Sequence, residues 1–214
     1  MVTRTDRIPD EVSHANEAEK RLLASALSLF SEKGYEGTSI REIIERAGVT
    51  RPVLYYYFEN KEHLFRRLVE SWFAELVEDM DRVLEGVEGY RERLKILIWN
   101  VFEHAEKSPQ VMRLIFHTFF APRHQAPKLD KDALWESRFS RIMGIVNEGI
   151  ACGDFEGRSP ETLAMVFCGM MDMHLMTKSN RPHMELSREL GETIVDIFLD
   201  GARSRVLAGG PGSV

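Results

Sequence analysis

A short run of residues, from Thr50 to Tyr57, places one guanidinium beside three consecutive tyrosines. Three successive residues span most of the circumference of a helix, so Tyr55, Tyr56 and Tyr57 cannot all be buried. Arginine can bond the edge of a guanine in two places, and hydroxyl groups bond phosphate oxygens. A single tyrosine is more often a core residue with its hydroxyl in water. Three of them beside Arg51, at the start of a short helix, favour a surface that contacts DNA.

Two short helices joined by a tight turn are predicted to position these side chains. Ser39 and Glu42 form the capping-box pair that begins a helix, and Gly48 stands where a left-handed backbone would end it. Pro52 fits the first turn of a second helix, because that turn has spare N–H groups. A helix, a glycine-containing turn and a second helix make the helix-turn-helix pattern. The apolar positions of the first helix recur with helical period, at Ile40, Ile43, Ile44 and Ala47.

Two segments of the chain carry a family resemblance. AGVTRPVLYYYFENKEHLF, residues 47–65, resembles the signature of the TetR family of transcriptional regulators, and LLASALSLFSEKGYEGTSIREII, residues 22–44, resembles that family's first two helices. The resemblance covers about the first third of the chain. It implies that the second helix of the motif enters the major groove. Many members have glycine or lysine near Pro52, which leaves the operator sequence open.

The resemblance also implies individual DNA contacts. Arg51 and Pro52 would meet base edges, the three tyrosines would meet bases or phosphates, and Lys61 would meet a phosphate. Residues of the first helix of the motif would approach the DNA backbone or a flanking base. The expected DNA-binding residues are Thr38, Ser39, Arg41, Thr50, Arg51, Pro52, Tyr55, Tyr56, Tyr57 and Lys61.

Length and composition are those of a soluble protein. The 214 residues allow one or two domains, and 43% are hydrophobic and 29% charged. The longest apolar run, residues 163–171, is well short of the roughly 18 residues that span a bilayer. The N-terminus is polar and predicts no signal peptide. Cys152 and Cys168 form no metal or redox motif, so we expect a cytoplasmic protein without cofactor or metal.

The net charge of −6 is unusual for a DNA-binding protein. Residues 1–67 contain 11 Lys and Arg against 11 Asp and Glu, and the rest contains 17 against 23. DNA binding must therefore depend on where charges lie, with Arg41, Arg51 and Lys61 expected on the DNA side. This distribution predicts a moderate dependence of DNA affinity on salt.

The whole chain reads as all-α, with about nine helices and no βαβ alternation. Residues 1 to about His14 are expected to form a flexible arm, and Gly34 to end the first long helix. A long helix is predicted from Asn60 to about Leu84, where Gly86 and Gly89 stop it. We expect a three-helix helix-turn-helix domain at 1–66 with its arm, and a helical ligand-binding and dimerisation domain at 67–214.

Aromatic and methionine side chains of the second domain predict a ligand pocket. Methionine adapts its shape and suits promiscuous apolar sites, although ordinary core packing is equally consistent with these residues. His174 and Asp172 are polar groups within this region, and a hydrogen-bonded or surface role is the more common one for each. The candidate lining is Trp99, Phe102, Phe116, Phe120, Trp135, Phe139, Met143, Met170 and His174. Such a lining would take a small lipophilic effector.

The last two helices predict a twofold dimer. Gly169 lies in mid-helix, where glycine costs about 1 kcal/mol relative to alanine and permits close approach of another helix. These helices also carry more apolar surface than one bundle face needs. The candidate interface is Val166, Phe167, Gly169, Met170, Ile194, Ile197, Phe198 and Gly201. Two motifs would then fit DNA half-sites about 34–36 Å apart or a multiple of that distance.

Three functions compete. The first is a ligand-responsive regulator, by family habit a repressor, that binds a palindromic operator as a homodimer. The second is a helical-bundle enzyme, but the Glu-x-x-His spacing of di-metal bundles occurs only at Glu11 and His14, in the arm. The third is a helical adaptor for another protein, which leaves Arg51, the tyrosines and Lys61 unexplained. We therefore expect a regulator and not an enzyme.

Overall fold

The computed structural model describes residues 8–120, 127, 129–155 and 157–202, and within them the side chains of 8–16, 117, 119 and 120 are left out. Over these ranges the chain forms nine α-helices and no strand, which confirms the all-α prediction. The helices are α1 (Ile8–Lys33), α2 (Ile40–Ala47), α3 (Arg51–Tyr57), α4 (Lys61–Leu84), α5 (Tyr90–Lys107), α6 (Pro109–Phe120), α7 (Lys131–Ala151), α8 (Pro160–Asn180) and α9 (Arg188–Ala202). None of these helices is long and apolar enough to cross a bilayer.

Helix α1 begins earlier than the sequence predicted. The flexible arm was expected to reach His14, but α1 starts at Ile8, and residues 1–7 lie outside the described part of the chain. The local sequence explains this start, because Pro9 fits a first helical turn and Asp10 and Glu11 favour the positive end of a helix dipole.

The chain divides into two compact units, which are described separately. Unit 1 consists of Met1–Glu75 and Ser108–Lys131, and unit 2 of Leu76–Lys107 and Asp132–Val214. Helix α4 is continuous and contributes its first part to unit 1 and its last part to unit 2. The expected domain boundary near residue 66 stays a prediction.

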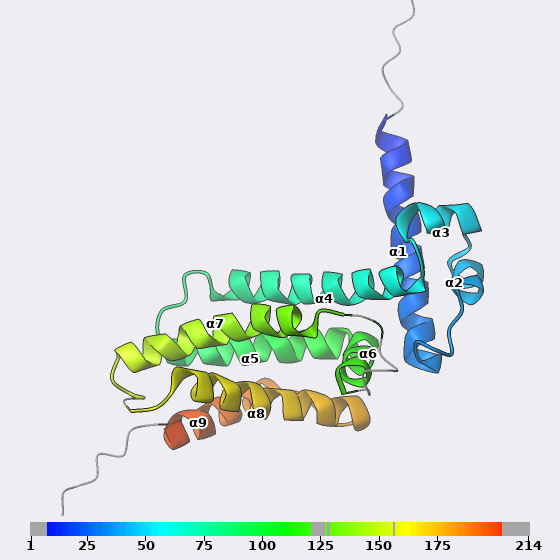
Figure 1. Cartoon of the computed structure of the whole chain (residues 1–214). Helices are drawn as coiled ribbons and strands as arrows, with labels where there is room; N and C mark the ends of the chain where they lie inside the picture. Colours follow the sequence, from blue (N-terminus) through cyan, green and yellow to red (C-terminus); the bar gives the residue numbers. More distant parts are fainter. Residues whose placement is uncertain (1–7, 121–126, 128, 156, 203–214) are drawn as a thin grey trace, which may run out of the picture. The chain divides into compact units, whose positions relative to one another are not determined.

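In unit 1, α1 packs against α2, α3 and α6 (Figure 1). Its centre is an aromatic cluster in which Phe30, Tyr35 and Phe65 have ring centroids 5.2–5.6 Å apart. Leu54, in the middle of α3, and Phe58, directly after its end, are fully buried and anchor the helix. Burial of these side chains fixes which face of α3 remains outside.

In unit 2, α5 packs against α8 and α9, and α8 packs against α9. Figure 1 shows α5, α7 and α8 running lengthwise alongside one another. Phe198 of α9 lies 5.2 Å from Phe167 and 6.0 Å from Phe155, ring centroid to ring centroid, and all three are buried. This aromatic group joins the last two helices to the turn that precedes α8.

Candidate nucleic-acid interface and effector region

The sequence prediction of a helix-turn-helix is met residue by residue in α2, the turn and α3. The Ser39 N–H donates to Glu42 Oε2 at 2.9 Å, and the Glu42 N–H donates to Ser39 Oγ at 3.3 Å, so the capping box is complete. Gly48 has φ = 61°, a left-handed conformation that glycine adopts without a steric penalty, and it ends α2. Thr50 then precedes α3, with Pro52 in its first turn. The cap and the glycine together set where α3 begins.

Helix α3 presents a polar aromatic row to solvent. Tyr55 is 44% exposed and Tyr56 78%, whereas Tyr57 is half-buried. The guanidinium carbon of Arg51 lies 5.6 Å from the centre of the Tyr55 ring, close enough for a cation–π interaction that orients the arginine. The Tyr56 and Tyr57 rings meet edge to face at 4.8 Å. The row offers a guanidinium and phenol hydroxyls, the groups that bond base edges and phosphates.

The tyrosines in this row differ in their setting. Desolvation raises the pKa of Tyr57, with a smaller contribution from neighbouring Tyr56 and Glu19, so its hydroxyl stays a proton donor at neutral pH. Pro52 and Thr50 are exposed at the start of the same helix. The structure therefore places five of the ten predicted DNA contacts on one exposed surface of α3 and its cap, with Tyr57 at its edge: Thr50, Arg51, Pro52, Tyr55 and Tyr56.

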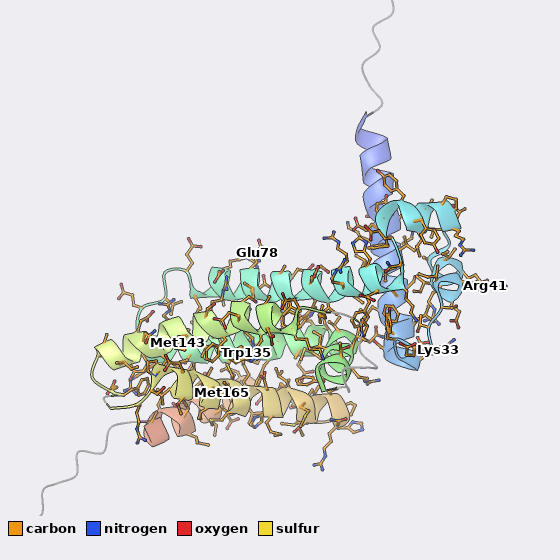
Figure 2. The ribbon with its side chains drawn as sticks, in the orientation of Figure 1. Lys33, Arg41, Glu78, Trp135, Met143 and Met165 are labelled. Atoms are coloured by element: carbon orange, nitrogen blue, oxygen red, sulfur yellow. The ribbon has the colours of Figure 1, made fainter. Side chains whose placement is uncertain are left out.

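Helix α2 contributes a highly exposed cation, Arg41. The Arg41 side chain is 87% exposed and extends from α2 on the side away from α1 (Figure 2). Its Nε donates to Glu45 Oε1 at 2.7 Å, an exposed pair that a phosphate could replace at small cost. The Ser39 hydroxyl, in contrast, donates to Glu42 Oε2 at 2.8 Å and is occupied by the cap.

Thr38 and Lys61 have partners inside unit 1. Thr38 is only 2% exposed, and its hydroxyl donates to the Gly34 carbonyl at 2.9 Å. Lys61 Nζ donates to the carbonyls of Tyr35 at 2.9 Å and Thr38 at 3.0 Å, and lies 4.2 Å from the centre of the Tyr35 ring. As DNA contacts, both residues stay predictions.

Sequence reasoning missed the ion pairs that attach α2 to α1. Arg46 Nη1 donates to Ser28 Oγ at 2.7 Å and to Glu32 Oε1 at 2.9 Å, and Lys33 Nζ donates to Glu42 Oε1 at 2.5 Å. The Lys33 hydrogen bond, with those from Ser39, lowers the pKa of Glu42 to about 2. No spacing rule links these positions, because they lie 9 to 18 residues apart.

The predicted effector residues fall in both units. Phe116 belongs to unit 1, and the side chain of Phe120 lies outside the described residues, whereas the other seven belong to unit 2. Within unit 2, Trp135 and Phe139 stack at 4.1 Å, and Phe102 lies 6.4 Å from His174. Phe102 and Phe139 are buried, and the rest of the unit 2 set is half-buried: Trp99, Trp135, Met143, Met170 and His174.

A polar cleft of about 710 Å³ lies in unit 2, among α4, α5 and α7. Its walls carry Glu78, Asp81, Arg82, Leu84, Glu85, Arg93, Arg141, Gly144, Ile145 and Glu148, none of which belongs to the predicted effector set. Arg141 binds Asp81 through two contacts of 2.7 Å, and Arg93 pairs with Glu148. Among the described residues no cluster of three or more histidine, cysteine or acidic side chains could hold a metal ion.

Asp172, considered above as a polar group near the pocket, has a buried partner. Arg138 of α7 donates to both carboxylate oxygens of Asp172 on α8, at 2.8 and 2.7 Å. The Arg138 side chain is 10% exposed and that of Asp172 31%. Burial opposes the charge on Arg138, but Asp172 outweighs this effect and raises the arginine pKa, so the guanidinium keeps its charge. His174 instead bonds the Met170 carbonyl at 2.6 Å within α8.

The predicted dimer residues divide into an exposed and a buried set. Val166, Gly169, Ile197 and Gly201 are exposed, and Met170 is half-buried. Phe167, Ile194 and Phe198 lie in the core of unit 2 beneath them. The exposed face is extended by Met165 and Met173, which are 54% and 57% exposed and which the sequence prediction omitted.

Comparison with known proteins agrees with this geometry. Residues 22–68, which span the motif, match the family model described as "Bacterial regulatory proteins, tetR family". Residues 22–68 therefore form a tetR-type helix-turn-helix segment. The segment that matches this family model thus coincides with the helices that carry the polar aromatic row.

Two curated tetR-type relatives and one solved structure extend the comparison. The "HTH-type transcriptional activator FasR" of Mycolicibacterium smegmatis is 30% identical over 122 residues, 57% of this chain and 53% of FasR. The "HTH-type transcriptional repressor KstR" of the same organism is 31% identical over 130 residues, 59% of this chain and 63% of KstR. The chain therefore spans less than two thirds of either relative.

The solved structure is that of the transcriptional regulator FadR from Bacillus subtilis in complex with stearoyl-CoA. It superposes with a TM-score of 0.75 at 20% identity, covering 85% of this chain and 98% of that one. At this identity the likeness establishes the fold of the chain and no more.

Proposed function

We propose that this protein is a transcriptional repressor that binds a palindromic DNA operator as a homodimer and releases it when a lipophilic small molecule binds. The observation that carries the proposal is the exposed row of Arg51, Tyr55 and Tyr56 on α3. Burial of Leu54 and Phe58 holds this row outward, and a stack on Tyr55 orients the arginine. A helix of this kind, second in a helix-turn-helix, fits the major groove.

The proposed DNA surface combines α3 with the exposed cation of α2. Arg51 would bond a guanine edge, Tyr55 and Tyr56 would contact bases or phosphates, and Arg41 would exchange Glu45 for a phosphate. Each phosphate contact makes log affinity fall more steeply with log salt, by about 0.9 in the slope. With few cations on this surface, the salt dependence should be moderate. Residues 1–66 would form the DNA-binding domain.

The homodimer would form through the exposed apolar face of α8 and α9. Met165, Val166, Met173 and Ile197 are large apolar side chains that are each about half exposed. Apolar side chains gathered on one face commonly mark an interaction surface. Gly169 and Gly201 lie among them, and an added Cβ at either would meet no atom of this chain within 4 Å. A second copy related by a twofold axis could therefore approach closely at both glycines.

The effector would be a lipophilic molecule bound by residues of 67–214. The support is the stacked Trp135–Phe139 pair and the adaptable methionines of α8. One structural neighbour was solved with stearoyl-CoA, which makes a long-chain acyl thioester the first compound to test. Operator and effector would each favour a different position of α4. A coupling free energy of about 1–3 kcal/mol between them would change operator affinity roughly 5–150-fold.

The test is selection of bound duplexes from a random DNA pool by the full chain, followed by release of the selected duplex. We expect a palindrome whose half-sites lie about 34–36 Å apart or at a multiple of that distance. Stearoyl-CoA and a panel of lipophilic compounds are then titrated against the complex by fluorescence anisotropy, with free CoA as the control. Selection without sequence enrichment would refute operator binding, and an enriched site that no compound releases would refute the effector.

A further inference from the structure

We propose that Glu32 and Arg46 are positioning residues of the DNA-binding surface, and that they hold α2 in one register along α1. Neither side chain belongs to the expected DNA-binding set. Their effect on affinity rests on the proposed DNA binding, whereas their hold on α2 can be measured in the protein without DNA.

Helix α2 has little apolar packing of its own to fix its position. It is eight residues long, too short to be stable without tertiary contacts. Its buried side chains are Ile43 and Ala47, and an isoleucine with an alanine gives few interlocking contacts to define one register. Polar contacts at the side of α2 can therefore decide where the helix lies along α1.

Four charged side chains pair across α1 and α2 in alternating order. Arg46 of α2 donates to both carboxylate oxygens of Glu32 on α1, at 2.9 and 3.3 Å. One turn earlier on the same face of α2, Glu42 accepts from Lys33 Nζ at 2.5 Å. A shift of α2 by one turn would place Glu42 against Glu32. A shift in the other direction would place Arg46 against Lys33, again like against like, so the alternation favours one register.

A hydroxyl group completes the contact between Glu32 and Arg46. Ser28 Oγ donates to Glu32 Oε1 at 2.7 Å and accepts from Arg46 Nη1 at 2.7 Å, so the three side chains are bonded to one another in a closed set. The hydrogen bond from Arg46, with that from Ser28, lowers the pKa of Glu32, so the carboxylate is charged at neutral pH. A guanidinium bonded to two oxygens fixes direction as well as distance.

The position of α2 determines what can reach DNA. Arg41 extends from the side of α2 away from α1 (Figure 2), and the turn 48–50 leads directly from α2 to α3. A shift of α2 along α1 therefore displaces the exposed row on α3. A binding surface works only when its supports hold it to within about 0.5 Å. If a fraction of the molecules holds α2 in place, the apparent affinity falls to that fraction of its full value.

The test is Glu32→Met, which removes the carboxylate and keeps an unbranched side chain. Loss of a negative charge ordinarily strengthens binding to a polyanion. We expect the opposite on the duplex that the wild-type protein selects. An exposed ion pair changes an equilibrium about threefold, so the two motifs of a dimer should together lose about tenfold in affinity. In the DNA-free protein, amide hydrogen exchange over residues 40–47 should become about threefold faster.

Matched variants separate position from charge. Glu70→Met removes a similarly exposed carboxylate, whose partner Arg66 lies on the same helix, so affinity should stay unchanged or rise. Arg46→Met should weaken binding at least as much as Glu32→Met, although it removes the opposite charge. The double variant Glu32→Met/Arg46→Met should bind no more weakly than Arg46→Met, because both changes break the same contact.

Any one of three results would overturn the proposal. They are binding by Glu32→Met that equals or exceeds that of wild type, losses that multiply in the double variant, and unchanged exchange over residues 40–47. If the wild-type protein selects no DNA, the proposed function fails, and the exchange measurement alone still decides whether Glu32 and Arg46 hold α2. Urea unfolding shows that each variant is folded, with a midpoint less than about 0.3 M below that of wild type.

Discussion

Removing the carboxylate of Asp172 should destabilise the protein far more than removing a surface acid. Asp172→Ala leaves the Arg138 guanidinium, with a side chain only 10% exposed, without either of its contacts at 2.8 and 2.7 Å. Breaking a buried ion pair from one side costs about 3–5 kcal/mol. Because Asp172 itself is 31% exposed, water can reach the vacated position, and we expect a loss near the lower limit, about 3 kcal/mol.

The assay is urea unfolding followed by circular dichroism at one fixed protein concentration. With an m-value of about 2–3 kcal/mol per molar, the loss corresponds to a midpoint about 1–1.5 M lower. Glu192→Ala is the matched control, because Glu192 pairs with Arg188 at the surface, where both side chains are about half exposed. That change should cost less than about 0.5 kcal/mol.

A double replacement separates the cost of leaving a buried charge unpaired from the cost of changing these two side chains. In Arg138→Met/Asp172→Leu no buried charge remains, and apolar side chains fill the space between α7 and α8. Such replacements are often neutral or stabilising, so the double variant should recover most of the loss. If Asp172→Ala unfolds at the same urea concentration as Glu192→Ala, the buried pair contributes no more to stability than a surface pair, and our reasoning is refuted.

Three further predictions concern the dimer, the thiols and acid stability. Gly169→Ala should raise helix stability by up to about 1 kcal/mol yet weaken the dimer about tenfold or more in sedimentation, because the added methyl group separates the two copies. Burial raises the pKa of the Cys168 thiol to about 11, so Ellman's reagent should modify exposed Cys152 quickly and Cys168 only after unfolding. The Lys33 hydrogen bond helps to lower the Glu42 pKa from 4.5 to about 2, so its stabilisation is complete above about pH 4.5 and disappears as the pH falls toward 2. Acid titration of unfolding should therefore be steeper over that range in wild type than in Glu42→Gln.

Each of these predictions has a control and a contrary outcome. Gly144→Ala adds a methyl group to an exposed helical glycine of α7 that also has no atom within 4 Å, and it should leave the dimer unchanged. If the dimer tolerates Gly169→Ala as well as Gly144→Ala, the two copies do not approach closely at Gly169. Equal reaction of both thiols in the folded protein would contradict the burial of Cys168. Parallel acid titrations of wild type and Glu42→Gln would contradict the lowered pKa of Glu42.

The helices and their ends could be predicted from the sequence because local chemistry determines them. Ser39 with Glu42, and Gly48 after them, act over three to six residues, and the structure has both features where the sequence placed them. The start of α8 is equally local, because Ser159 Oγ accepts from the Thr162 N–H at 3.2 Å. Such bonds need only the backbone of their own turn, so spacing reveals them.

Contacts between distant residues could not be predicted in this way. The Arg138–Asp172 pair and the bonds of Lys61 depend on how separate helices pack, over sequence distances of 34, 26 and 23 residues. Helix α8 shows a second limit. It carries apolar side chains all round, so periodicity does not distinguish buried Phe167 from exposed Val166 beside it. The predicted dimer set therefore mixes core and surface residues.

The central claim is that the exposed row on α3 reads DNA, and one binding titration tests it directly. Wild type and the double variant Arg51→Ala/Tyr56→Ala are titrated against the selected duplex by fluorescence anisotropy, with Lys107→Ala as the matched loss of a cation elsewhere. We expect the double variant to bind about a hundredfold more weakly or worse, with an unchanged circular dichroism spectrum and dimer, while Lys107→Ala binds as wild type does. Wild-type affinity in the double variant would contradict the claim.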